Sequence, residues 1–189
     1  MSERLRTFIS IDVEEKELLD EIERIQGALL ASNARIKPVE RENIHLTIRF
    51  LGVIPMTIVN EVINIMKRIK FAPFTMTIEH LGAFPERSTR PRVIWLGVTE
   101  GAEEVSKIHE QIERELRTIG FPKDRERFVP HITIARVKRS NPKLIRVINE
   151  MRNIKVGSMS VKYIRLKKSI LTSRGPIYET LFETKATEV

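Results

Sequence analysis

The sequence predicts a fold that mixes helices and strands and consists of two related lobes facing each other. Segments with helical spacing of apolar residues are interleaved with alternating, strand-like segments along the 189-residue chain. One short phrase (apolar residue or proline, His, apolar residue, Thr, apolar residue) is written twice, as "IHLTI" (44–48) and "PHITI" (130–134). No segment between the halves has the composition of a linker, so we expect residues 1–189 to form a single domain of two intertwined lobes.

The first half of the chain predicts two strands and two helices. The alternating segment "LRTFISI" (5–11) predicts the first strand, and the first copy of the phrase predicts the second. Asp12 and Glu15 have the spacing of a capping box at the start of one helix, and Pro55 opens the other. The apolar faces expected for these helices are Leu18, Ile22, Ile25 and Leu29, and Ile58, Val62, Ile65 and Ile69.

The second half repeats this order loosely. Strands are predicted in "FTMTIEHLG" (74–82) and "RVIWLGV" (92–98), and the second copy of the phrase predicts another. A helix carries Val105, Ile108, Ile112 and Leu116 on one stripe and ends at Gly120, and a shorter helix covers about residues 142–151. The tail reads as a hairpin of "SVKYIRLKKSILT" (160–172) and "IYETLFET" (177–184), turned at residues 173–176.

The composition of the chain excludes several classes of protein. The net charge of +8 attracts polyanions, although charge alone is equally compatible with a basic surface that binds nothing. The chain has no cysteine, which excludes disulfides and thiolate chemistry. No apolar run approaches the roughly 20 residues that span a bilayer, and the charged start does not resemble a secretory signal. We therefore expect a cytoplasmic protein with no membrane partner.

The repeated phrase places the same two functional groups on one side of each strand. Residues i and i+2 of a strand share a face, so His45 lies with Thr47 and His131 lies with Thr133. If the two strands are adjacent, two imidazoles and two hydroxyls line one groove. One neutral imidazole could take a proton from water while the other, protonated, gives one to a leaving oxygen. Threonine hydroxyls could donate to phosphate oxygens, so the pattern indicates metal-free phosphate-ester chemistry.

Two other interpretations of these histidines compete with this one. A single His-x-Thr on a strand is more often a packed or solvated histidine than a catalytic one, but two matched copies among four histidines favour function. A zinc site needs a third or fourth ligand, and none occurs at close spacing. His80 and His109 fall in other predicted elements. We therefore predict no metal and no other cofactor.

The paired phrases resemble the His-x-Thr-x motifs of the 2H phosphoesterase superfamily, standing here as "HLTI" (45–48) and "HITI" (131–134). The likeness runs the length of the chain. The segments "RTFISIDV", "RFLG", "GAFP" with "PRVIWLGV", and "LKKSILTSRGPIYETL" resemble one branch of the superfamily, the RNA 2′,3′-cyclic phosphodiesterases, also called 2′-5′ RNA ligases. The resemblance implies an α+β, bilobal, pseudo-two-fold-symmetric fold, in which two antiparallel sheets line a central cleft with helices on the outside.

The resemblance also implies roles for particular residues. His45 would be the proton donor to the ribose 3′-oxygen, His131 the proton acceptor that activates water, and Thr47 and Thr133 would hold the phosphate. Family members carry an arginine five residues after the second histidine, which here is Arg136. Strand alternation alone, however, points Arg136 away from His131.

Alternation also predicts which face of the first motif strand Arg49 and Phe50 occupy. It gives Arg49 the right parity to face the phosphate, so Arg49 is the alternative to Arg136. It assigns Phe50 to the core, although the family position suggests packing near the substrate base.

Three functions remain open at this point. The first is hydrolysis of a terminal RNA 2′,3′-cyclic phosphate to a 2′-phosphate by a monomeric enzyme. The second is the reverse reaction, ligation of RNA ends, such as tRNA halves, through a 2′-5′ bond. The third is a non-catalytic RNA-binding protein, which two intact histidines disfavour because Lys or Arg would serve binding better.

Overall fold

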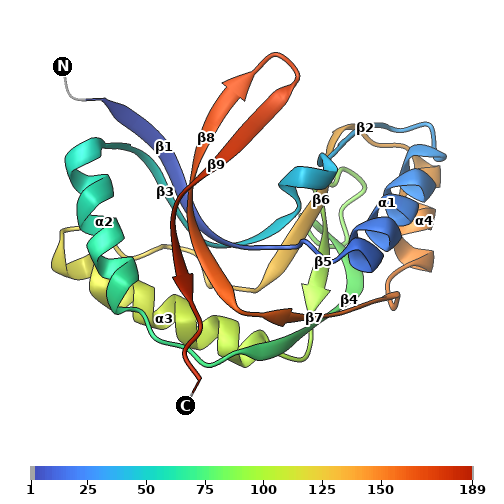
Figure 1. The fold of residues 1–189 in the computed structure, drawn as a ribbon. Helices are drawn as coiled ribbons and strands as arrows, with labels where there is room; N and C mark the ends of the chain where they lie inside the picture. The colour runs from blue at the N-terminus through green and yellow to red at the C-terminus, as the bar shows by residue number, and fades with distance from the viewer. Residues whose placement is uncertain (1–2, 189) are drawn as a thin grey trace.

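The computed structural model describes residues 3–188 and forms an α+β fold built on one antiparallel sheet (Figure 1). The first half contains β1 (Arg4–Asp12), α1 (Lys16–Leu30), β2 (Arg35–Pro38), the short 3-10 helix η1 (Arg41–Asn43), β3 (His45–Pro55), α2 (Met56–Arg68) and β4 (Phe74–Phe84). The second half contains β5 (Val93–Val98), α3 (Ala102–Thr118), β6 (His131–Arg139), α4 (Pro142–Glu150), β7 (Lys155–Val161), β8 (Tyr163–Thr172) and β9 (Gly175–Lys185).

The sheet has two halves that meet at the two predicted motif strands. The strand order is β7-β4-β5-β6-β3-β1-β8-β9, with β2 paired to β6. The strands β3 and β6 are joined by one residue pair, Leu46 with Ile132, whereas the other neighbours are paired over longer stretches. The two antiparallel sheets expected from the sequence are therefore the two halves of one sheet, joined at a single point between the motifs.

The helices cover the sheet in two pairs, as Figure 1 shows at opposite ends of the molecule. Helices α1 and α4 pack against each other and on the half that contains β4 and β7, while α2 and α3 pack together on the half that contains β3. The half built mainly from later strands is thus covered partly by the first helix. This exchange of elements intertwines the two lobes.

The predicted apolar stripes form much of the core. Leu18, Ile22, Ile25 and Leu29 of α1, and Val105, Ile108, Ile112 and Leu116 of α3, are all buried. On the motif strands, Leu46, Ile48, Ile132 and Ile134 are also buried and join the same cluster. Burial of one face of β3 and of β6 leaves their other face free to line a site.

Two strands were not predicted. The edge strand β2 has only four residues, two of them basic, and ends in proline, so it is too short to stand out as a strand. The predicted strand over residues 160–172 is instead split into β7 and β8 around Lys162. Because β7 pairs with β4 and β8 pairs with β1, the chain crosses there from one half of the sheet to the other.

Candidate active site

A pocket of about 560 Å³ lies over the junction of the two sheet halves. It is lined by His45 and Thr47 from β3, by Thr133 and Arg136 from β6, and by residues of β1, β2, β8 and β9. The Leu46–Ile132 pair sets the strands antiparallel, so continuing its register puts His45 level with Thr133 and Thr47 level with His131. The two histidines are thus diagonal across the junction, and each has the other strand's threonine beside it.

A β-bulge in β6 brings Arg136 to this pocket. Trp95 of β5 pairs with Thr133 and Ile94 pairs with Ala135, so Ile134 is an extra residue on β6. Ile134 and Ala135 are consecutive and both fully buried. The alternation is therefore shifted by one residue, and the exposed Arg136 emerges on the side of His131 and Thr133. The alternation argument, which points Arg136 away from His131, was wrong because strict alternation does not survive a bulge.

The first motif carries a matching bulge, which reverses the predicted orientations of Arg49 and Phe50. Ser10 of β1 pairs with Thr47 and Ile9 pairs with Arg49, so Ile48 is the extra residue. Phe50 then lines the pocket with 45% of its surface exposed, and its assignment to the core was wrong. Phe50 and Arg136 occupy equivalent places, each five residues after its histidine.

Arg49 lies on the other side of the sheet. It forms an ion pair with Glu113 of α3, and both side chains are about nine-tenths buried. Its guanidinium also donates to the carbonyl of Pro122 at 2.8 Å. The structure thus places Arg49 outside the pocket, where it joins β3 to α3 and the loop that follows.

Both motif histidines are held in the same tautomer by backbone carbonyls. Nδ1 of His45 is 2.7 Å from the carbonyl oxygen of Asn43, and Nδ1 of His131 is 2.7 Å from that of Val129. A carbonyl can only accept, so each Nδ1 must carry the hydrogen and each Nε2 is left for chemistry. Nε2 of His45 lies 2.9 Å from Oγ1 of Thr47.

Aromatic rings fix the position of each imidazole. The ring of His45 lies 5.0 Å from Phe8 and 5.4 Å from Tyr178. The ring of His131 lies 5.4 Å from Phe84 and 6.3 Å from Trp95. Two aromatic neighbours on each side repeat the pseudo-symmetry of the motifs. Neither these rings nor the two carbonyls could be predicted, because they belong to other elements or to the backbone.

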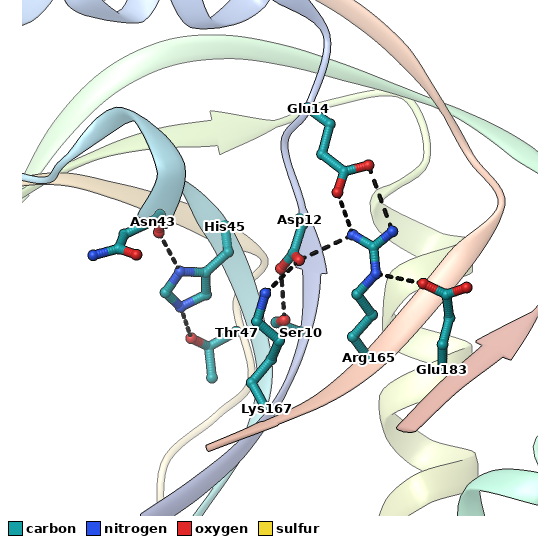
Figure 2. Close-up of polar contacts among 9 residues, drawn as sticks. All are labelled: Ser10, Asp12, Glu14, Asn43, His45, Thr47, Arg165, Lys167 and Glu183. Atoms are coloured by element: carbon teal, nitrogen blue, oxygen red, sulfur yellow. Dashed lines mark hydrogen bonds and ion pairs between the residues drawn. The ribbon is translucent and has the colours of Figure 1, made fainter. Parts of the chain in front are cut away.

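A cluster of charges lies behind His45, on β1 and on the strands β8 and β9 that follow it in the sheet (Figure 2). Asp12 is the residue opposite His45 in the β1–β3 register. Its carboxylate accepts from Lys167 at 2.6 Å, from Arg165 at 3.0 Å and from Ser10 at 2.9 Å. Arg165 also pairs with acidic groups nearer the surface, at Glu14 and Glu183.

These surroundings shift the pKa values of His45 and Asp12. Burial lowers the pKa of His45, and the charges of Lys167 and His131 act in the same direction, whereas the bond to the Asn43 carbonyl and the charge of Asp12 oppose them. Burial would raise the pKa of Asp12, but the hydrogen bond and charge of Lys167, with the bonds from Ser10 and Arg165, hold it below its usual value.

The other two histidines lie apart from the motifs. His80 is in β4 beside Glu79, and His109 is in α3, stacked on Phe128 with ring centroids 4.0 Å apart. Within residues 3–188, no three His, Asp or Glu side chains gather as a group that could hold a metal ion. In the same part of the chain, no helix is long and apolar enough to cross a membrane.

A family model described as LigT-like phosphoesterase matches the chain twice, over residues 11–95 and 96–178. The chain belongs to this family. It falls within the 2H phosphoesterase superfamily, as the paired motifs predicted. Because each match contains one histidine motif, the family's repeat corresponds to the two motif strands and the symmetric bulges described above.

Similar sequences support the assignment to the LigT-like family. A protein of Aeropyrum pernix is 41% identical over 171 residues, covering 89% of this chain and 97% of the relative. One of Archaeoglobus fulgidus is 34% identical over 183 residues, covering 94% and 98%. Both are named RNA 2′,3′-cyclic phosphodiesterase.

The fold is shared with solved structures of other proteins. Substrate-free Escherichia coli LigT aligns with a TM-score of 0.79 at 24% identity, covering 99% of this chain and 100% of LigT. A Thermus thermophilus protein aligns with a TM-score of 0.81 at 24% identity, covering 96% and 97%. Escherichia coli LigT has also been solved with phosphate and with 3′-AMP.

Proposed function

We propose that this protein is an RNA 2′,3′-cyclic phosphodiesterase that opens a terminal 2′,3′-cyclic phosphate to a 2′-phosphate. One observation carries the proposal: two histidines with the same tautomer lie diagonally across one sheet junction, and His45 shares a pocket there with two threonines and an exposed arginine. The names of the relatives from Aeropyrum pernix and Archaeoglobus fulgidus, and the phosphate and 3′-AMP complexes of LigT, support the same substrate class.

In the proposed reaction, the two Nε2 atoms act on opposite sides of the phosphorus. Nε2 of His131 takes a proton from water, and the water oxygen forms a new bond to phosphorus. The bond from phosphorus to the ribose 3′-oxygen breaks, and Nε2–H of His45 gives its proton to that oxygen. The products are a 2′-phosphate and a free 3′-hydroxyl. His45 leaves the step neutral and His131 leaves it protonated, so exchange with solvent restores both.

The remaining pocket residues would stabilise the charge on the phosphate. Thr47 and Thr133 can donate hydrogen bonds to its non-bridging oxygens, and Arg136 can supply a forked donor with positive charge. Burial favours the neutral form of His45 in the substrate-free protein. A bound phosphate anion opposes that shift, because a negative charge nearby favours the imidazolium. We therefore expect substrate binding itself to favour protonation of His45, which can then act as the acid.

Ligation remains the alternative use of the same groups. A ribose 5′-hydroxyl in place of water would attack the phosphorus in the same ring-opening step and form a 2′-5′ bond, but water at its bulk concentration favours hydrolysis. We further propose that residues 1–189 work as one domain, because elements from both lobes line one pocket. A monomer in the cytoplasm is part of the same proposal.

Incubation of the protein with RNA that ends in a 2′,3′-cyclic phosphate, in the presence of EDTA, should yield a 2′-phosphate. The expectation follows from acid-base chemistry carried by histidine alone. The product is identified by its resistance to a phosphatase specific for 3′-phosphate ends and by phosphorus NMR. Loss of turnover in EDTA that zinc or manganese restores would contradict the mechanism. A 3′-phosphate product would mean that the 2′-oxygen is the leaving group.

Arg136→Lys should lower kcat about 10-fold or more, even on a cyclic mononucleotide, because an ammonium cannot place a fork of donors on two oxygens. Steady-state kinetics on adenosine 2′,3′-cyclic phosphate checks this. Arg49→Lys is the matched control, since that arginine is paired with Glu113 outside the pocket. Unchanged turnover in Arg136→Lys would remove Arg136 from the phosphate site.

A further inference from the structure

We infer that a groove next to the active-site pocket, whose charged residues are all basic, binds the phosphodiester on the 5′ side of the terminal nucleotide. The inference rests on the proposed function, because the pocket must hold the cyclic phosphate end for the groove to receive the next phosphate. It assigns a subsite for the RNA backbone to two segments that lie far from each other in the sequence.

The groove has a volume of about 1130 Å³ and lies between residues 85–92 and residues 136–145. The first segment leads into β5, and the second contains the end of β6 and the start of α4. Because β5 and β6 are paired, the two segments are neighbours, and the amide of Val137 donates to the carbonyl of Arg92 at 2.9 Å. Arg136 lines this groove and the active-site pocket alike. An RNA chain whose 3′ end lies at His45 and Thr133 can therefore continue past Arg136 along the protein surface.

The charge of the groove has one sign. Its lining includes five cations, Arg90, Arg92, Arg136, Lys138 and Arg139, and no Asp or Glu. All five side chains are exposed, and none takes part in an ion pair in the structure of residues 3–188. By contrast, the partly buried arginines Arg49 and Arg165 are neutralised by carboxylates. Unpaired exposed cations are available to replace the counterions of a phosphate backbone.

A helix end adds to this field. Helix α4 begins at Pro142, which lines the groove with its capping residue Asn141. The positive end of the helix dipole therefore points at the same space as the five cations. This arrangement suits a phosphate and gives no hydrogen-bond pattern specific for a base, so we expect the groove to recognise backbone rather than sequence.

The side of the pocket away from Arg136, near Arg6 and Phe50, suits an RNA chain less well. Arg6 lies there with its guanidinium 4.9 Å from the ring centre of Phe50. An arginine that already lies on an aromatic ring offers less free positive charge than the five exposed cations of the groove. The groove beyond Arg136 is therefore the favoured path for the next phosphate.

The test compares two small substrates that differ by a single phosphate: adenosine 2′,3′-cyclic phosphate with and without a 5′-phosphate. We expect kcat/KM of the wild-type protein to be about 10-fold higher for the 5′-phosphorylated compound, the effect of one charge-assisted hydrogen bond. In Arg90→Ala/Arg139→Ala this preference should fall to near unity, while turnover of the compound without the 5′-phosphate stays unchanged.

Two controls make the test specific. Arg114→Ala/Arg117→Ala removes the same charge from exposed positions on α3 that line neither the pocket nor the groove, and it should keep the preference. Arg92→Ala/Lys138→Ala repeats the groove change at different residues and serves if the first pair fails to fold. For a longer RNA, either groove variant should bind with a shallower dependence on salt, by about one unit of slope per lost phosphate contact.

The outcomes separate the inference from the proposed function. No hydrolysis of either compound by the wild-type protein would overturn the function itself. Hydrolysis without a preference for the 5′-phosphate, or a preference that survives in both groove variants, would overturn the inference alone. Equal loss on both compounds would place the groove residues in the catalytic pocket and would also overturn it.

Discussion

His45→Ala and His131→Ala should each lower kcat by about 10²–10⁴-fold, the usual contribution of a general acid or base. The double variant should be little worse than either single variant, because groups that act in one proton-transfer step are strongly non-additive. Steady-state kinetics on an RNA with a 2′,3′-cyclic phosphate end checks both statements. Binding of that RNA should survive in all three variants, since the lysines and arginines are unchanged.

The two single variants should differ on a substrate whose leaving group needs no proton. A nucleoside 2′-(4-nitrophenyl phosphate) is such a probe. If His45 is the acid, His45→Ala should recover much of the lost rate on this ester, whereas His131→Ala should not. The opposite pattern would reverse the two roles, and that is the arrangement to which the lowered pKa of His45 in the substrate-free protein would point.

His80→Asn is the control for loss of a histidine elsewhere. His80 lies outside the pocket and has a φ of 69°, which asparagine tolerates better than alanine does. Its activity should match that of the wild-type protein. A single motif variant that keeps most of its rate would contradict the two-histidine mechanism.

The sequence predicted the parts of this site that depend on local repetition. His45, Thr47 and Thr133 line one pocket, because period-two alternation holds within each short motif. His131 lies two residues before Thr133 on β6. Alternation failed one residue later, at Ile48 and Ile134, where a bulge inserts an extra residue in each strand. A bulge has no reliable signature in a single sequence, so only the family resemblance pointed to Arg136.

The charged groups behind His45 escaped prediction for a different reason. Asp12 and Lys167 are 155 positions apart and meet only because β1 lies between β3 and β8 in the sheet. Strand order is set by long-range packing and pairing, which local patterns do not encode. Lys167 was read as part of a hairpin, and nothing in "LKKSILT" marked it as a buried cation.

Asp12→Asn should lower the free energy of unfolding by about 3–5 kcal/mol at neutral pH, as expected when one partner of a buried pair is removed. Both side chains are nearly nine-tenths buried, and Asp12 is the hydrogen-bond acceptor of the Lys167 ammonium in the structure of residues 3–188. Lys167→Met should cost less, because Asp12 keeps its bonds from Arg165 and Ser10. Urea unfolding of the two variants and the wild-type protein gives the comparison.

The stability difference should depend on pH with a defined sign. The folded-state pKa of Asp12 is lowered, so its stabilisation is present above the unfolded value of about 3.9 and is lost as pH falls through the folded value. The gap between wild type and Asp12→Asn should therefore be constant near neutral pH and close below about pH 4. A gap that widens in acid would contradict the ionised pair.

The same two variants should move the pH dependence of turnover in opposite directions. The groups that bear on the charge of His45 are Asp12 on β1, Lys167 on β8 and His131 on β6, and Tyr178 of β9 packs on its ring. Asp12 raises the pKa of His45 and Lys167 lowers it. If His45 is the acid, the alkaline limb of the kcat profile should shift to lower pH in Asp12→Asn and to higher pH in Lys167→Met. The double variant should fall between them, because the two charges act on the same imidazole with opposite sign. Parallel shifts in both single variants would mean that the pair acts only through the packing of β1 against β3.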